Sequence, residues 1–219
     1  MNSKVNHVTL EQFYAVVFEQ EVLEVSPDTL DVINESHLFL KDFSANKVIY
    51  GVNTGFGPMA QYRIQDADTL QLQYNLIRSH CSGSGDLLSP SIVKAAMLTR
   101  LTNLSKGKSG IHQSVVLLLQ ELINKDITPV IFAHGGVGAS GDLVQLAHLA
   151  LVLIGEGEVI YKGQRQPTAE VFALEKLSPI EVVIREGLSL INGTSVMTGA
   201  GLVNYFYAKK LVNWSLQFA

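Results

Sequence analysis

The sequence predicts a mainly helical protein with a few short strands, and three observations support this fold class. From Asp66 onward, most of the chain carries apolar residues at the 3.6-residue spacing of amphipathic helices. Strand-like segments are few and short, and glycine-rich turns separate the helical segments. Of the 219 residues, 47% are hydrophobic and 16% are charged, so the chain can bury a sizeable core and is neither disordered nor collagen-like.

Caps, periodicity and turn residues predict the elements in order. Ser26, Pro27 and Asp28 are typical of a helix start and predict a helix that runs to about Phe43. The β-rich segment 47–52 predicts a short strand that ends in a glycine-rich loop. Further helices are expected over residues 70–77, 90–104, 113–123, 143–154 and 202–216, and a small hairpin over residues 158–162 and 164–166.

Charge and cysteine content argue against several classes of protein. Sixteen basic and twenty acidic residues give a net charge of -4, which disfavours nucleic acid as a partner. The single cysteine, Cys81, can form neither an internal disulfide nor a multi-cysteine zinc site, and it fits a cytoplasmic protein. The histidines show no ligand-like clustering, so no metal is expected. No signal peptide and no apolar run of about 20 residues is found, so no membrane association is expected.

The densest chemical signal is a glycine-rich segment, and one interpretation of it is a nucleotide site. The spacing of Gly136, Gly138 and Gly141 matches a dinucleotide-binding fingerprint. The acidic residue that such a site needs, Glu156, precedes the candidate strand 159–161 instead of following it. The alternation of further strands and helices is also missing, so the nucleotide interpretation is disfavoured.

A second interpretation of the same segment is chemical. Ala139, Ser140 and Gly141 combine a small residue, a hydroxyl that can leave as water and a residue without Cβ. A tight turn could bring the Gly141 nitrogen onto the Ala139 carbonyl, and cyclisation with loss of water would create an electrophile, which ordinary side chains do not provide. From these residues alone, a plain helix start with Asp142 in its first turn is the more economical interpretation.

Five ordered sequence blocks resemble the aromatic amino acid ammonia-lyases, which include the histidine, phenylalanine and tyrosine lyases. The blocks are YGVNTGFG at 50–57, QYNLIRSH at 73–80, Asn103 with GKSG at 107–110, GVGASGDL at 136–143 followed by Leu146-Ala147-His148, and LINGT at 190–194. The resemblance covers about residues 45–215. It implies the N-terminal part of the family's fumarase/aspartase-like helical fold, with a catalytic domain over 1–193 and the incomplete start of a central helix bundle over 194–219.

The resemblance also implies a role for particular residues. Residues 139–141 would cyclise on their own into 4-methylidene-imidazol-5-one, so no external cofactor is expected. Tyr50 would take the β-proton of the substrate, which requires surroundings that favour the phenolate. Asn192 would hydrogen-bond near the new ring and the substrate. Further substrate contacts are expected from Gly57, Ser79 and His80. Without the resemblance, Tyr50 would be a core residue, Asn192 part of a turn and His80 a partly buried, hydrogen-bonded histidine.

The implied activity is non-oxidative elimination of ammonia from an aromatic L-amino acid. Ser79-His80 resembles the pair found in histidine lyases, so conversion of histidine to urocanate is expected. Conversion of tyrosine to p-coumarate is the alternative, because His80 can also bond to a phenol. A phenyl ring would leave His80 without a partner, so phenylalanine should be the poorest substrate. An aminomutase or an inactive fragment of the same family are further alternatives.

Family members are considerably longer than this chain and form tetramers. Their remaining part supplies a second catalytic tyrosine and the arginine that binds the substrate carboxylate. The resemblance therefore implies a homotetramer for the complete protein, and a 219-residue chain that lacks turnover by itself.

Overall fold

A computed structural model describes residues 5, 7–45, 47–62, 64, 66–183 and 185–218, and helices dominate them, which confirms the predicted fold class. The α-helices are α1 Leu10–Phe18, α2 Pro27–Ser44, α3 Asp66–His80, α4 Pro90–Leu104, α5 Gln113–Asn124, α6 Leu143–Leu153, α7 Thr168–Glu175, α8 Glu186–Ile191 and α9 Ser195–Phe218, and a 3-10 turn, η1, spans Gly57–Met59. The strands are β1 Ser84–Leu87, β2 Thr128–Pro129, β3 Phe132–His134, β4 Glu158–Tyr161 and β5 Gln164–Pro167.

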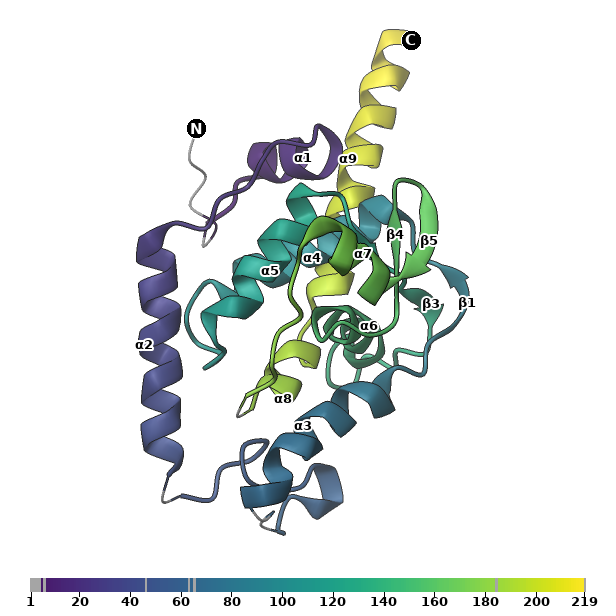
Figure 1. The fold of residues 1–219 in the computed structure, drawn as a ribbon. Helices are drawn as coiled ribbons and strands as arrows, with labels where there is room; N and C mark the ends of the chain where they lie inside the picture. Colours follow the sequence, from purple (N-terminus) through teal and green to yellow (C-terminus); the bar gives the residue numbers. More distant parts are fainter. Residues whose placement is uncertain are drawn as a thin grey trace.

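Helix α4 lies at the centre of the fold, with α1, α5 and the first half of α9 packed against it (Figure 1). Its start is fixed by Ser89, whose side chain accepts a hydrogen bond from the Ile92 amide, and by Pro90 at the first helical position. Nine of its fifteen residues are buried, so it is covered on nearly all sides. Gly199 of α9 lets the two helices approach closely, because a Cβ there would come within 2.6 Å of the Ala96 nitrogen.

Helix α9 is longer than the sequence predicts and changes character along its length. Its buried residues are Ser195, Val196, Gly199 and Val203, all in the first half. The second half extends away from the body of the molecule (Figure 1) and exposes large apolar side chains, including Leu211 and Trp214. Among the described residues, no helix combines the length and apolar character needed to cross a membrane.

The strands form two small antiparallel sheets, β1–β3 and β2–β4–β5. The predicted hairpin is confirmed as β4 and β5, joined by Lys162 and Gly163 with φ of 51° and 74°, as a two-residue hairpin turn requires. A dinucleotide fingerprint needs a parallel strand–helix–strand unit, and every strand pairing in the described residues is antiparallel. The nucleotide interpretation of the glycine spacing is therefore wrong.

The strand predicted over residues 47–52 is also wrong, because this segment forms a turn. The Asn53 side chain explains the difference. Its Oδ1 accepts a hydrogen bond from the Ile49 amide at 2.8 Å, and its Nδ2 donates to the Lys47 carbonyl at 2.7 Å. The backbone groups that a strand would offer to a neighbouring strand are thus satisfied locally. Tyr50 lies within a turn, not at the end of a strand.

Candidate active site

The loop over residues 135–142, here called the triplet loop, connects β3 to α6 and turns sharply at the predicted triplet. Gly141 pairs through its backbone with both Gly138 and Ala139, which brings the first and last triplet residues together. Gly141 has a φ of +87°, and a Cβ there would collide with the carbonyl oxygen of Gly193. Only glycine fits this position, and the tight turn expected from the residues is present.

A second segment, Asn192–Gly193, lies directly against the triplet loop. Asn192 closes α8 by donating its backbone N–H to the Leu188 carbonyl at 3.0 Å. Its side-chain Nδ2 donates to the Ser140 Oγ at 3.5 Å, so two predicted site residues from distant parts of the sequence are in contact. The Gly193 carbonyl accepts a hydrogen bond from the Asp142 amide at 2.7 Å. The triplet is therefore held from one side by the end of α8.

Asp142 has a different role from the one its position in the sequence suggests. Helix α6 begins at Leu143, and the Asp142 side chain makes no capping bond to its own helix. Its Oδ2 instead accepts hydrogen bonds from the amides of Val196 at 2.8 Å and Met197 at 3.0 Å. A carboxylate at this position satisfies amides that α9 cannot bond internally and complements the helix dipole. Asp142 thus ties the triplet loop to the start of α9.

Arg100, on α4, supports the same region from inside the core. It is 2% exposed, and its Nη2 donates to the Ser189 carbonyl near the end of α8. A Cβ at Gly193 would collide with its Nη1, so the guanidinium lies directly beside the Gly193 backbone. Burial lowers the pKa of Arg100 to about 10, and the nearby charge of Asp142 partly opposes this shift. The side chain therefore remains a buried cation at neutral pH.

Tyr50 is not the core residue that its sequence context alone would suggest, since 52% of it is exposed. Its hydroxyl accepts a hydrogen bond from the Gly57 amide at 3.4 Å, and its ring packs edge-on against Phe56 at a centroid distance of 6.0 Å. The two candidate residues Tyr50 and Gly57 are thus in contact. Among the described residues, no hydrogen bond or ring contact joins Tyr50 to the triplet loop.

The Tyr50 turn is nevertheless fixed to the framework that carries Asn192. The Gly51 carbonyl accepts a hydrogen bond from Gln73 Nε2 of α3 at 3.4 Å. A Cβ at Gly51 would overlap the side chain of Leu188 on α8, so the turn lies tightly against that helix. Helices α3, α6 and α8 pack on one another, and α8 leads directly into Asn192.

Ser79 and His80 occupy the C-terminal end of α3. Ser79 Oγ donates to the Leu76 carbonyl at 3.2 Å, and His80 Nδ1 lies 2.8 Å from the same oxygen. A ring nitrogen can only donate to a carbonyl, so this contact assigns the His80 proton to Nδ1. Its Nε2 is then an acceptor in the neutral ring. That atom suits a ligand that offers an N–H or O–H group.

The segment after His80 runs against the beginning of the triplet loop. Gly83 donates its N–H to Nε2 of His148, on α6, at 3.3 Å. A Cβ at Gly135 would come within 3.2 Å of the Gly83 Cα. Burial lowers the pKa of His148, which keeps its ring neutral and its Nε2 able to accept. The triplet loop, Asn192, the Tyr50 turn and His80 are therefore all attached to the packed helices α3, α6 and α8. Among the described residues, hydrogen bonds join Asn192 to Ser140 and Tyr50 to Gly57, but none joins these two pairs to each other.

The residues missed by sequence reasoning are Asp142, in its role at α9, and Arg100. No local pattern identifies either role, because their partners are 54 and 89 residues away in the chain. The only signal in the sequence is that Arg100 lies between apolar residues of a predicted helix, and Lys94 on the same helix shares this feature. Within the described parts of the chain, no group of three or more His, Cys, Asp or Glu side chains is arranged to hold a metal ion.

Comparison with known proteins adds an independent result to this geometry. The aromatic amino acid lyase family matches residues 8–219. The chain belongs to this family. A histidine ammonia-lyase of Shouchella clausii is 44% identical over 213 residues, which cover 97% of this chain and 43% of that protein. Matches of this extent span the positions of all five blocks, and the resemblance to this family is confirmed.

Solved structures of related proteins have the same fold. The tyrosine aminomutase of Streptomyces globisporus is 35% identical, with a TM-score of 0.86 over 92% of this chain and 38% of that one. The histidine ammonia-lyase of Trypanosoma cruzi is 30% identical, with a TM-score of 0.84 over 93% of this chain and 39% of that one. The chain spans about 40% of the length of the curated histidine ammonia-lyases that it matches.

Proposed function

We propose that the complete protein is an ammonia-lyase that converts histidine to urocanate. The observation that carries this proposal is the geometry of the triplet loop, in which Ala139 and Gly141 pair across Ser140 while Gly193 closes the other side. Similarity to histidine ammonia-lyases over 97% of the chain supports the reaction class. Because the chain spans about 40% of those relatives, the activity is proposed for the complete protein.

The triplet residues fit the family's prosthetic group. We propose that the Gly141 nitrogen bonds to the carbonyl carbon of Ala139, whose oxygen leaves as water with the amide protons of Ser140 and Gly141. Ser140 then loses its hydroxyl and its Cα proton as a second water, which leaves an exocyclic methylidene. No oxidant or reductant is needed. The resulting ring supplies an electrophile for the substrate amine, which no ordinary side chain provides.

The surrounding residues have roles that follow from their positions. Asn192, in contact with Ser140, would orient groups at the triplet by hydrogen bonding. Tyr50 is half-exposed, so its hydroxyl is free to reach a substrate β-hydrogen as the general base. The amide of Gly57 donates to that hydroxyl at 3.4 Å, which places Gly57 beside the proposed base. We propose a substrate-binding role for Gly57 through this contact.

The choice of histidine as substrate rests on His80. Its Nε2 is an acceptor, because Nδ1 donates to the Leu76 carbonyl, and an imidazole N–H is a matching donor. The exposed Ser79 beside it leaves space for a ring. A phenol O–H would also satisfy His80, and the similarity to a tyrosine aminomutase favours tyrosine as the second candidate, with either elimination or amine migration as the outcome.

The face of the site that would meet the substrate is open in this chain. Ala139, Ser140, Tyr50 and Ser79 are all exposed, whereas elimination from an amino acid needs a site that excludes water. We propose that the rest of the complete protein covers this face in a cytoplasmic homotetramer. The exposed apolar half of α9 supports this. We also propose that a catalytic domain over 1–193 ends just before this helix, and that residues 194–219 begin the central helix bundle.

The test is a chimera in which this chain replaces the matched part of the Shouchella clausii relative. Urocanate and p-coumarate formation are measured at equal histidine and tyrosine concentrations. We expect urocanate to form faster, and Ser140→Ala to abolish both activities in a folded protein. Faster p-coumarate formation would assign tyrosine instead. Faster cinnamate formation from phenylalanine would overturn the argument from His80, and activity in Ser140→Ala would overturn the role of the triplet.

A further inference from the structure

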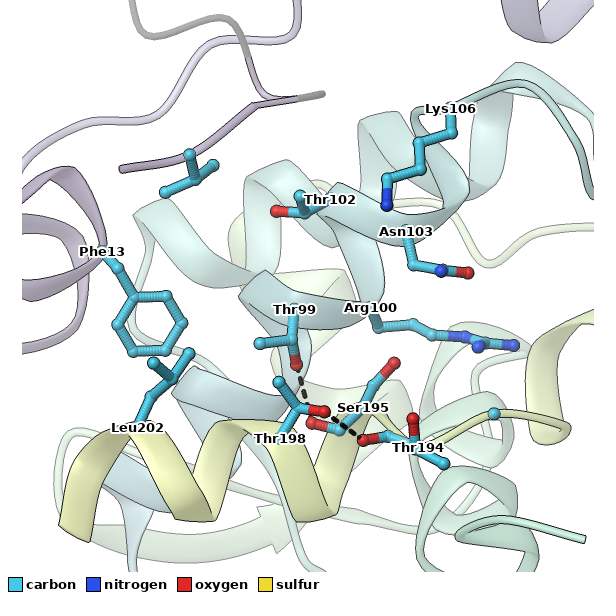
Figure 2. A pocket seen from close by; sticks show the side chains of 12 residues that line it. Phe13, Thr99, Arg100, Thr102, Asn103, Lys106, Thr194, Ser195, Thr198 and Leu202 are labelled. Carbon is cyan, nitrogen blue, oxygen red and sulfur yellow. Dashed lines mark hydrogen bonds between the residues drawn. The ribbon is translucent and has the colours of Figure 1, made fainter. Parts of the chain in front are cut away.

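A pocket of about 380 Å³ lies beside the triplet region, between α4 and the start of α9. Figure 2 shows its two ends. Phe13 and Leu202 stand at one end, while Arg100, Asn103 and Lys106 project at the other. Gly193 is also part of its wall. None of the side chains proposed for catalysis or substrate binding lines this pocket. The proposed lyase reaction therefore does not explain why the pocket is lined by cations at one end and apolar side chains at the other.

The polar end of the pocket is positively charged and contains no carboxylate. Its described lining residues include two cations, Arg100 and Lys106, and no aspartate or glutamate. Asn103 and Lys106 are exposed, and their side chains make no hydrogen bond or ion pair with the described residues. Hydroxyl groups complete the lining, from Thr99, Thr102, Thr194, Ser195 and Thr198. The Asp142 carboxylate acts on Arg100 from outside this lining, and the Lys106 ammonium has no ion-pair partner among the described residues, so the polar end attracts an anion.

Arg100 provides an independent reason to expect a ligand. A guanidinium carries five N–H donors, and within the described residues only its Nη2 has a hydrogen-bond partner, the Ser189 carbonyl. Its Nε is buried and has no hydrogen-bond partner among the described residues. The pKa of Arg100 stays near 10, so the group is charged while its solvation is removed. A buried cation with unused donors is costly unless an acceptor occupies the space beside it.

We propose that this pocket binds a small carboxylate that carries an apolar group. The carboxylate accepts from Arg100 and Lys106, with the Asn103 amide as a further donor. The apolar group lies against Phe13, Leu202 and the partly buried Val8. An inorganic anion would satisfy the cations and leave the apolar end empty, so the two-ended lining favours an organic acid. This site goes beyond the proposed lyase reaction and does not depend on it.

The test uses hexanoate, an aliphatic acid that cannot be a lyase substrate, on the 219-residue protein. Isothermal titration calorimetry and the thermal unfolding midpoint are measured with hexanoate, 1-hexanol and inorganic phosphate. We expect saturable binding and a raised midpoint with hexanoate, because a ligand that binds only the folded state stabilises it. 1-Hexanol should not bind, since it lacks the charge. Phosphate binding as tight as that of hexanoate would overturn the assignment to organic acids.

Matched variants locate the site. Lys106→Met keeps the apolar stem and removes the charge, and it should weaken hexanoate binding by about tenfold or more. Lys108→Met removes an exposed charge outside this pocket and should change the affinity by less than about twofold. Tyr50→Phe alters the proposed catalytic site and should leave binding unchanged. Equal losses in both lysine variants, or loss in Tyr50→Phe, would place hexanoate elsewhere and overturn the proposal.

Discussion

The triplet loop has one side that is held by buried contacts and one side that is exposed. Behind the loop, Asp142, Gly193 and the buried Arg100 hold it through contacts that join four helices. On its open side Ser140 is exposed, as is Tyr50 in a separate turn, and among the described residues each makes one long side-chain hydrogen bond, of 3.5 and 3.4 Å. The chain therefore supplies the contacts that support the triplet loop and leaves the proposed reactive groups exposed.

This comparison predicts that substitutions behind the loop change stability, whereas substitutions in front change activity alone. The four variants that test it are ordered by their expected effect on the free energy of unfolding. Each can be measured by chemical denaturation, and the chimera with the Shouchella clausii relative provides activity where that is needed.

The largest decrease in the free energy of unfolding is expected for Gly141→Ala. The added Cβ would collide with the Gly193 carbonyl, and the φ of +87° is unfavourable for alanine, so we expect a loss of about 3 kcal/mol or more. Gly138→Ala is the matched control, because Gly138 has a similar φ of +80° and no neighbour within 4 Å of the added Cβ. That variant should lose only about 1 kcal/mol from backbone strain. Equal losses would show that the contact with Gly193 does not matter.

For Asp142→Ala we expect a smaller decrease in the free energy of unfolding, of about 1–3 kcal/mol. The substitution removes the acceptor of two α9 amides and a negative charge that acts on the buried Arg100. Asp28→Ala is the control, because Asp28 lies exposed in the first turn of α2 and should cost about 0.5 kcal/mol. If the two variants lose the same amount, Asp142 does not support the loop.

A pH dependence should follow from His148, whose pKa is lowered in the folded state by burial. Above its ordinary value of 6.5, the ring is neutral in both the folded and unfolded states and pH has no effect. Below that value the unfolded state binds the proton first, so stability falls as pH is lowered, by at most about 1.4 kcal/mol per pH unit. His148→Gln should reduce this slope. An unchanged slope would contradict the role of the neutral ring as acceptor for Gly83.

The smallest effect on stability is expected for Tyr50→Phe, below about 0.5 kcal/mol, because the hydroxyl of this half-exposed residue makes one long hydrogen bond. In the chimera, the same variant should lower the turnover rate by about 10²–10⁴, the usual contribution of a general base. A variant that unfolds easily and retains its rate would make Tyr50 a structural residue and move proton abstraction to another group.

Local signals in the sequence predicted much of the fold. Ser26 with Pro27 predicted the start of α2, and the hairpin predicted over 158–162 and 164–166 is present, with Lys162 in the turn instead of the first strand. A signal was also overlooked at α1, where Thr9 and Gln12 form a capping box. The strand expected over 47–52 failed because the side chain of Asn53 satisfies the backbone of that segment, which composition alone does not reveal.

The candidate site was predictable in part, through its similarity to a known family. The five blocks identified the triplet and the residues around it, and the contact between Asn192 and Ser140 agrees with their proposed proximity. The support behind the loop was not predictable, because it depends on a contact between α4 and α8 and on a carboxylate that caps a different helix from its own. Such long-range partners carry no periodic signal.

The most direct test of the central claim is the mass of the triplet segment in the full-length chimera. Trypsin cuts after Lys125 and Lys162 and releases residues 126–162, which contain the triplet and no other cleavage site. Mass spectrometry should find this peptide lighter than its sequence by two water molecules, whereas Ser140→Ala can lose only the water of ring closure. A folded chimera whose peptide keeps its full sequence mass would contradict the proposal that this loop forms the electrophile.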